Sequence, residues 1–187
     1  RALWHKPLIL HYHGTDIRGK WNLKSKRTLM RSADKILYCS RDLESRYMPE
    51  KAMCMPNPVD VDYFRNFGGR FKQSNSALTM SYYADDKASK LAWEHDLNLT
   101  IVPRHVPYPE MPKLLSQFEY YVEVKRDICH NEVLGRSDDL SCVALQALAC
   151  GLKVVRWDGE IIETLPEEHE PEHVAATIYA LYEELLG

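Results

Sequence analysis

The chain has 187 residues, 45% of them apolar, which is enough to bury one good core or two small ones. Its apolar runs stay short of the roughly 20 residues of a membrane-spanning helix, and its first residues do not resemble a secretory signal, so we expect a cytoplasmic protein. The five cysteines are scattered without a Cys-x-x-Cys pair, which argues against a structural zinc site or a redox couple; they are Cys39, Cys54, Cys129, Cys142 and Cys150.

The first part of the chain predicts strands alternating with helical segments. Strands are expected at residues 7–13, 35–39 and 52–55, a mixed helical segment up to residue 32, and a helix at 41–47. Strands joined by helical connections pair in parallel. A free-standing dinucleotide-type domain has about six strands. Because the chain begins with Arg1 close to its first strand, we expect this domain to be incomplete and the chain to be a fragment.

A polar stretch at residues 67–76, rich in Gly, Gln, Asn and Ser, predicts a linker between two domains at 1–70 and 77–187. A second alternation follows it. Strands are expected at 77–84, 99–102, 120–124 and 152–156, and helices at 85–96, 109–118, 141–150 and 172–186. The fold class is therefore α/β, with a parallel sheet in each domain.

The charge is distributed unevenly along the chain. Residues 1–73 hold 15 of the 24 Lys and Arg residues and 7 of the 27 Asp and Glu residues. The rest of the chain holds 9 Lys and Arg and 20 Asp and Glu. Residues 18–31 combine basic and apolar side chains, which suits an anionic membrane surface, although a solvated basic helix face gives the same pattern. The basic residues are Arg18, Lys20, Lys24, Lys26, Arg27 and Arg31.

The loop that precedes the helix at 141–150 carries a candidate binding site. Ligands of open parallel sheets bind beyond the carboxyl ends of the strands, and free backbone amides at a helix start suit a diphosphate. Asp138 and Gln146 lie eight residues apart, so both could reach the same side of a bound sugar nucleotide. The simpler interpretation is that Asp138 or Asp139 caps the helix while Gln146 is exposed.

Four short motifs occur in a fixed order along the chain. They are His-Gly-x-Asp at 13–16, Ala-Asp-x-Ile-x-x-x-Ser at 33–40, Pro-Asn-x-Val-Asp-x-x-x-Phe at 56–64, and an Asp-x7-Gln pair at 138–146 that leads into Ala-x-Ala-Cys-Gly. Together they resemble the GT-B glycosyltransferases of the glycogen synthase and mannosyltransferase type. The resemblance implies two Rossmann-like domains and transfer of a sugar from a nucleotide sugar, such as a UDP- or GDP-sugar, to a glycan or lipid-linked acceptor.

The resemblance also implies roles for individual residues. His13 faces the sugar from the first domain, and Asp16 and Arg18 belong to the same acceptor-side loop. The amides near Leu140, Ser141 and Cys142 hold the diphosphate, Asp138 binds sugar hydroxyls and Gln146 binds the ribose. Lys87 fills the lysine position of an Arg/Lys pair that neutralises the leaving diphosphate, so no metal is needed.

The sequence departs from this family pattern at several positions. No arginine partners Lys87 in the loop at 81–87, Asp138 and Gln146 replace two glutamates, and the glycine-rich loop that precedes the family's His-Gly motif is absent. These changes favour a second hypothesis, a catalytically degenerate binding or regulatory subunit. A third is one half of a split transferase, whose partner chain completes the first domain.

A metal-dependent hydrolase is a competing enzyme hypothesis. His11 and His13 are two apart on a predicted strand and point the same way, with His5 and Asp16 nearby as further ligands. The remaining ligands of such a site cannot be assigned from the sequence. Nucleic-acid binding is disfavoured, because the basic stretch lacks a series of aromatic residues beyond Trp21.

Overall fold

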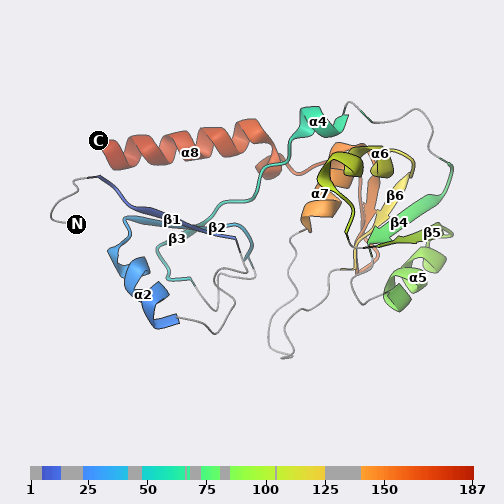
Figure 1. Cartoon of the computed structure of the whole chain (residues 1–187), viewed down its shortest axis with the longest axis horizontal. Helices are drawn as coiled ribbons and strands as arrows, with labels where there is room; N and C mark the ends of the chain where they lie inside the picture. The colour runs from blue at the N-terminus through green and yellow to red at the C-terminus, as the bar shows by residue number, and fades with distance from the viewer. Residues whose placement is uncertain are drawn as a thin grey trace. The chain divides into compact units, whose positions relative to one another are not determined.

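The computed structural model describes residues 6–13, 23–41, 48–65, 67, 73–80, 85–103, 105–124 and 140–187 (Figure 1). The chain divides into two compact units. The first unit holds the described residues of Arg1–Asn57 together with Glu172–Gly187, and the second holds those of Pro58–His130 together with Leu140–Pro171. In the described part of the chain, no helix is long and apolar enough to cross a membrane.

The first unit contains a three-stranded sheet in the order β1-β2-β3. The strands are β1 (Ile9–Tyr12), β2 (Lys35–Tyr38) and β3 (Ala52–Cys54), and both pairings are parallel. The register places Ile9 opposite Lys35 and Ile36 opposite Ala52. The three parallel strands predicted from the sequence are confirmed, whereas most of the helix predicted at 41–47 lies outside the described residues.

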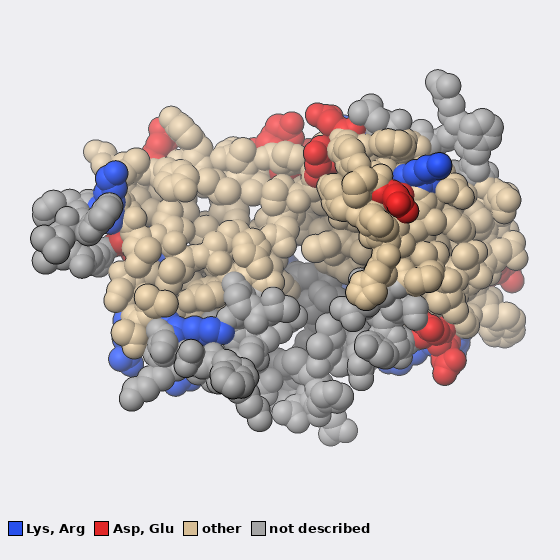
Figure 2. All heavy atoms as spheres, in the orientation of Figure 1, with Lys and Arg blue, Asp and Glu red and all other residues tan. Residues whose placement is uncertain are grey.

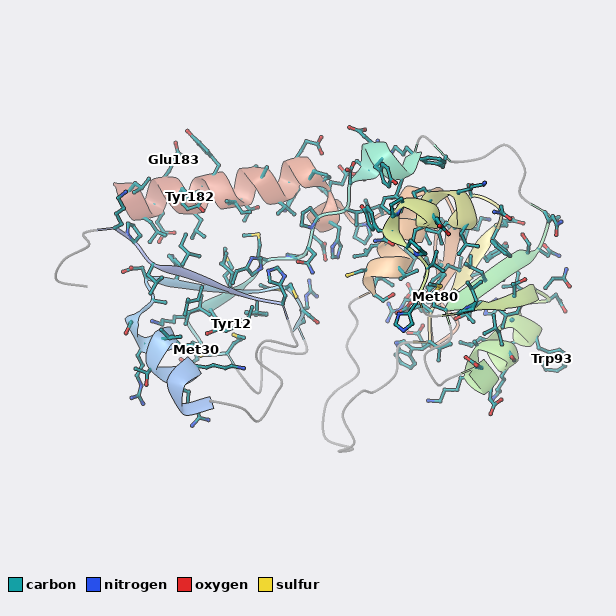
Figure 3. All side chains as sticks on the ribbon, viewed as in Figure 1. Tyr12, Met30, Met80, Trp93, Tyr182 and Glu183 are labelled. Carbon is teal, nitrogen blue, oxygen red and sulfur yellow. The ribbon has the colours of Figure 1, made fainter. Side chains whose placement is uncertain are left out.

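Helices cover both faces of this sheet, α2 (Leu23–Ser32) on one face and α8 (Pro171–Leu186) on the other (Figure 1). Side chains alternate along a strand. Accordingly Ile36 and Tyr38 pack with Met30 of α2, whereas Leu37 packs against α8. Figure 3 shows Met30 and Tyr12 between the sheet and α2. The first unit is therefore a three-layer α/β/α arrangement with a core on each face of its sheet.

The position of α8 differs from the predicted domain ranges, which assigned it to the second domain. Its apolar stripe lies against Leu37 and Met55 of the first unit and consists of Val174, Ile178, Leu181 and Leu185. The Nζ of Lys35 in β2 also bonds Oε1 of Glu184 at 2.6 Å. The stripe made the helix recognisable in the sequence, but a stripe does not specify which sheet it covers.

The second unit contains a five-stranded sheet in the order β5-β4-β6-β7-β8. Four of its strands are parallel, and β8 pairs antiparallel with β7. The short β8 was not predicted. The strands are β4 (Ser76–Met80), β5 (Asn98–Val102), β6 (Tyr120–Val122), β7 (Lys153–Val155) and β8 (Ile161–Ile162). The α/β class with mostly parallel sheets is confirmed in both units.

Helices also cover both faces of the second sheet. Strand β4 is buried throughout: Ala77 faces α5, and Leu78 and Met80 face α6 and α7. Trp93 of α5 projects into solvent and is 79% exposed (Figure 3). The α-helices of this unit are α4 (Val61–Arg65), α5 (Asp85–Glu94), α6 (Met111–Leu115) and α7 (Cys142–Ala149), and the 3-10 helices are η2 (Tyr108–Glu110) and η3 (Glu167–His169).

The segment at 59–64 belongs to the core of the second unit, although the predicted ranges placed it in the first domain. Phe64 of α4 is fully buried and meets Tyr108 of η2 edge-on at 5.8 Å. Tyr63 stacks on Tyr108 at 5.7 Å with an interplanar angle of 7°. Burial, then Asp60 and Tyr63, raise the pKa of the Tyr108 phenol. The units therefore divide between Asn57 and Pro58, before the polar stretch at 67–76.

Candidate functional site

The strand order of the second sheet places its switch point between β4 and β6. Strand β5 lies on one side of β4 and β6 on the other, so the connections that leave β4 and β6 run in opposite directions. Open parallel sheets bind ligands outside the carboxyl ends of such a strand pair. We call these strand ends and the helix starts that follow them the switch-point edge; its described residues are Met80, Asp85–Lys87, Glu123, Leu140–Cys142 and Gln146.

The start of α7 at this edge is fixed by Ser141. Its backbone is extended (φ −68°, ψ 158°), and its hydroxyl accepts a hydrogen bond from the Ala144 amide at 3.2 Å. A serine before an apolar run is a preferred N-cap because its side chain satisfies one of the four amides that lack a partner within the helix. The helix predicted at 141–150 is confirmed, but its cap is Ser141 and not the aspartate of the simpler interpretation.

Glu123 is a buried carboxylate at the end of β6, and the sequence analysis did not single it out. The residue is 4% exposed, its amide donates to the Val155 carbonyl at 2.8 Å, and its Oε2 accepts the Ser141 hydroxyl at 2.8 Å. The signal in the sequence was an acidic residue inside an otherwise apolar strand. A negative charge near a helix amino terminus is favourable, so Glu123 and Ser141 together join the strand end to α7.

We expect Ser141→Ala to lower the free energy of unfolding of the second unit by about 1–3 kcal/mol, because it removes the α7 cap and one hydrogen bond of a buried carboxylate. Urea denaturation measures this change. Ser141→Thr keeps the hydroxyl, so its free energy of unfolding should fall much less. A Ser141→Ala protein as stable as the wild type would show that neither hydrogen bond contributes measurably.

The structure brings most of the predicted donor-side residues to helices that start at the switch-point edge. Lys87 is exposed on the first turn of α5, and Cys142 is exposed on the first turn of α7. Gln146 follows Cys142 by one turn and is half-buried, on a helix whose other residues are largely buried. Leu140 and Ser141 are half-buried just before α7. Asp138 lies outside the described residues.

An arginine that the sequence analysis did not consider follows β7, the neighbour of β6. The Arg156 guanidinium bonds Oε2 of Glu160 at 2.9 Å and lies 3.3 Å from Oδ2 of Asp158, and its side chain is 14% exposed. Both carboxylates belong to the turn between β7 and β8. The charge of Arg156 is therefore largely balanced within its own turn, and among the described residues of the switch-point edge the cation is Lys87.

At the carboxyl edge of the first sheet, two of the sequence motifs meet. The Nδ1 atom of His13, which follows β1, lies 3.2 Å from Oδ1 of Asn57, which follows β3. The rings of His13 and His11 are 4.2 Å apart between centroids. Asp16 and Arg18, predicted in the same loop as His13, lie outside the described residues.

Acidic residues of the motifs at 33–40 and 56–64 hold strand and helix ends in place. Oδ2 of Asp34 accepts the Leu8 amide at 2.8 Å, and the Asp34 amide donates to the Leu8 carbonyl at 2.9 Å, which ties the entry of β2 to β1. Oδ1 of Asp60 accepts the Tyr63 amide at 3.0 Å and so caps α4. These two positions hold the fold at strand and helix ends.

The predicted pair of metal-binding histidines does not gain further ligands in the described residues. His11 and His13 are neighbours, yet the described part of the chain contains no group of three or more His, Cys, Asp or Glu that could hold a metal ion. His5 and Asp16, the other residues of that hypothesis, lie outside it. The metal-hydrolase hypothesis therefore receives no support from these positions.

The basic stretch predicted at 18–31 forms α2 in its described portion. Figure 2 shows Lys and Arg side chains gathered over this helix. Arg27 and Arg31 are exposed one turn apart, Leu29 is 52% exposed, and Met30 is buried against the sheet. The exposed surface of α2 therefore carries positive charge and one apolar side chain.

A scan against protein-family models found no match to this chain, and a search of curated proteins found no significantly similar sequence.

Proposed function

We propose that the chain is part of a GT-B-like glycosyltransferase that binds a nucleotide sugar at the switch-point edge and transfers its sugar without a metal ion. The observation that carries this proposal is the capped amino terminus of α7 at the carboxyl end of β6, because β6 pairs with β4, the strand that precedes the helix bearing Lys87. This is where parallel α/β sheets bind nucleotides, and the amides of a helix start suit a diphosphate.

Each residue at this edge would have a distinct part in donor binding. The Cys142 and Val143 amides lie at the first two positions of α7 and would donate to the diphosphate. Gln146 would hydrogen-bond the ribose hydroxyls through its amide. A diphosphate carries negative charge and needs a compensating cation, and Lys87 would supply it.

The first unit would bind the acceptor of the sugar. In this proposal His13 faces the transferred sugar, and Asp16 and Arg18 belong to the acceptor loop. The exposed Arg27 and Arg31 of α2 suit an anionic membrane surface, where a lipid-linked acceptor would be presented. Transfer to an acceptor in anionic vesicles, compared with the same acceptor in neutral vesicles, tests this part directly.

Calorimetric titration with UDP, GDP and their sugar conjugates tests donor binding. We expect one nucleotide to bind, and Lys87→Ala and Gln146→Ala each to weaken it by roughly 10-fold or more, the loss of a charged or buried hydrogen bond. Two matched variants serve as controls. Lys90→Ala removes a lysine of α5 that pairs with Glu94, and Gln117→Ala removes a glutamine bonded to the Lys113 carbonyl. Neither should change the affinity.

Binding without transfer would favour the second hypothesis. The absence of an arginine at 81–87 and the Gln at position 146 suit a protein that keeps a nucleotide site but has lost catalysis. A chain that binds the nucleotide yet transfers no sugar, alone or with a partner chain, would act as a binding or regulatory subunit. A chain that binds none of these nucleotides would contradict the proposed donor site.

A further inference from the structure

Strand β5 lies at an edge of the second sheet and has no charged residue or proline. It pairs with β4 on one side, and none of the described residues pairs with its other side (Figure 1). An open edge is a template for another strand, so edge strands are commonly very short or carry lysine or proline. The opposite edge, β8, has two residues, whereas β5 has five uncharged ones.

One hydrogen bond shows which backbone groups of β5 face outward. The Asn98 amide donates to the Asn75 carbonyl at 2.8 Å, so Asn98 directs its amide toward β4. Successive residues of a strand direct their amide and carbonyl groups to alternate sides. Leu99 and Ile101 therefore direct both of these groups away from β4, to the outer edge of the sheet.

The outward-facing edge ends on both sides of these two residues. Pro103 has no amide hydrogen to donate. The Leu97 amide already donates to the Ala92 carbonyl at 2.8 Å. The hydrogen-bonding groups that β5 offers to another strand are therefore the amides and carbonyls of Leu99 and Ile101.

A second copy of the chain satisfies all of these groups if the two β5 strands run antiparallel about a two-fold axis at Thr100. Leu99 of one copy then lies opposite Ile101 of the other, and the two residues exchange both amide–carbonyl hydrogen bonds. The two-fold axis repeats this exchange on the other side of Thr100. Thr100 itself lies opposite its symmetry copy.

The side chains of β5 suit the same pairing. Leu99 packs on the face of the sheet that α5 covers, and Ile101, two residues further, lies on that face and is 43% exposed. Thr100 lies on the other face and is exposed. The pairing would cover Ile101 with an apolar neighbour and place two threonines opposite each other, and cross-strand pairs of both kinds stabilise sheets.

We propose that the outer edge of β5 is a homodimer interface, at which two chains pair their β5 strands antiparallel about Thr100 and join their second sheets into one. The pairing closes on itself, because it uses the β5 edge of both chains and leaves neither for a third. It involves the second unit alone and is independent of the proposed function.

Charge at position 100 tests the pairing, because only the residue on the two-fold axis lies opposite itself. In sedimentation equilibrium, the mass of the wild type should rise with concentration to twice that of the chain. Thr100→Lys and Thr100→Asp each bring like charges together and should stay monomeric, whereas Thr100→Val should dimerise. An equal mixture of Thr100→Lys and Thr100→Asp should recover a one-to-one dimer, which native mass spectrometry identifies.

Hydrogen exchange identifies the edge and checks the fold of the variants. In the wild type, the Leu99 and Ile101 amides should exchange more slowly at high protein concentration, and Thr100→Lys should abolish this dependence. The Asn98 and Val102 amides point to β4 and should stay protected in both proteins. Ile101→Pro removes an outward amide without a bond to β4, so it should be monomeric and supplies the answer if Thr100→Lys does not fold.

A wild type that stays monomeric, a Thr100→Lys protein that still dimerises, or a mixture that stays monomeric would overturn the proposal. Protected Leu99 and Ile101 amides in a monomer would also overturn it, because another part of the chain would then cover the edge. Ile161→Lys is the matched control, since Ile161 is 40% exposed in the opposite edge strand β8. It should leave the dimer intact, and a dimer lost there would place the interface at β8 and contradict the proposal.

Discussion

Phe64→Ala is expected to destabilise the second unit by about 3–5 kcal/mol, the usual cost of removing a large aromatic side chain from a core. Phe64 is 0% exposed and lies in the same core as Leu78 of β4 and Leu148 of α7. Its ring also meets Tyr63 edge-on at 5.5 Å. The short helix α4 cannot fill the space that the ring would leave, so a cavity should remain.

Native-state hydrogen exchange locates the loss, because it reports stability strand by strand. We expect the amides of β4 and β6 to lose protection, while those of β2 in the first unit keep theirs. Phe67→Ala is the matched control, since that ring is 44% exposed and should cost far less. If β1 and β2 lost protection instead, residues 59–64 would belong to the first unit, as the sequence-based ranges had it.

Most of the regular structure was predictable because the apolar patterns are clear. The run at 36–39 is short and apolar between polar flanks, and it lies in β2, whose two faces are both covered. The apolar run at 142–149 gave the position of α7, but its cap is Ser141 and not Asp138. The polar residues at 67–76 suggested a linker, but polarity marks exposure and does not mark a boundary between units. The boundary depends on which core Val59 and Phe64 join, and that is decided by tertiary packing.

The candidate site was predictable only where it follows from the order of strands and helices. Lys87, Ser141 and Gln146 follow strands that proved to be neighbours, so parallel pairing brings them to one edge. Glu123 was missed because a single acidic residue inside a strand gives no sign of its partner on the next helix. The His13 and Asn57 contact was missed for a related reason, since it requires knowing that β1 and β3 flank the same strand.

Leu181→Ala is expected to destabilise the first unit by about 2–5 kcal/mol, the range for a buried leucine replaced by alanine. Leu181 of α8 is 5% exposed and packs with Leu37 of β2, Met55 and Val174. Hydrogen exchange should show lost protection in β1 and β2 with β4 unchanged. Leu186→Ala, on the same helix, removes a leucine that is 73% exposed and should leave both units as they were.

The outcome for Leu181 decides how the chain is organised. If β2 loses protection, the first unit is discontinuous in sequence, because the chain leaves it at Asn57 and returns to it at Glu172. A chain ending at Pro171 would then lack the helix that covers Leu37 and Met55, and its first sheet would expose an apolar face. If β4 lost protection instead, α8 would stabilise the second unit. The two units would then each be continuous in sequence, as the predicted ranges 1–70 and 77–187 have them.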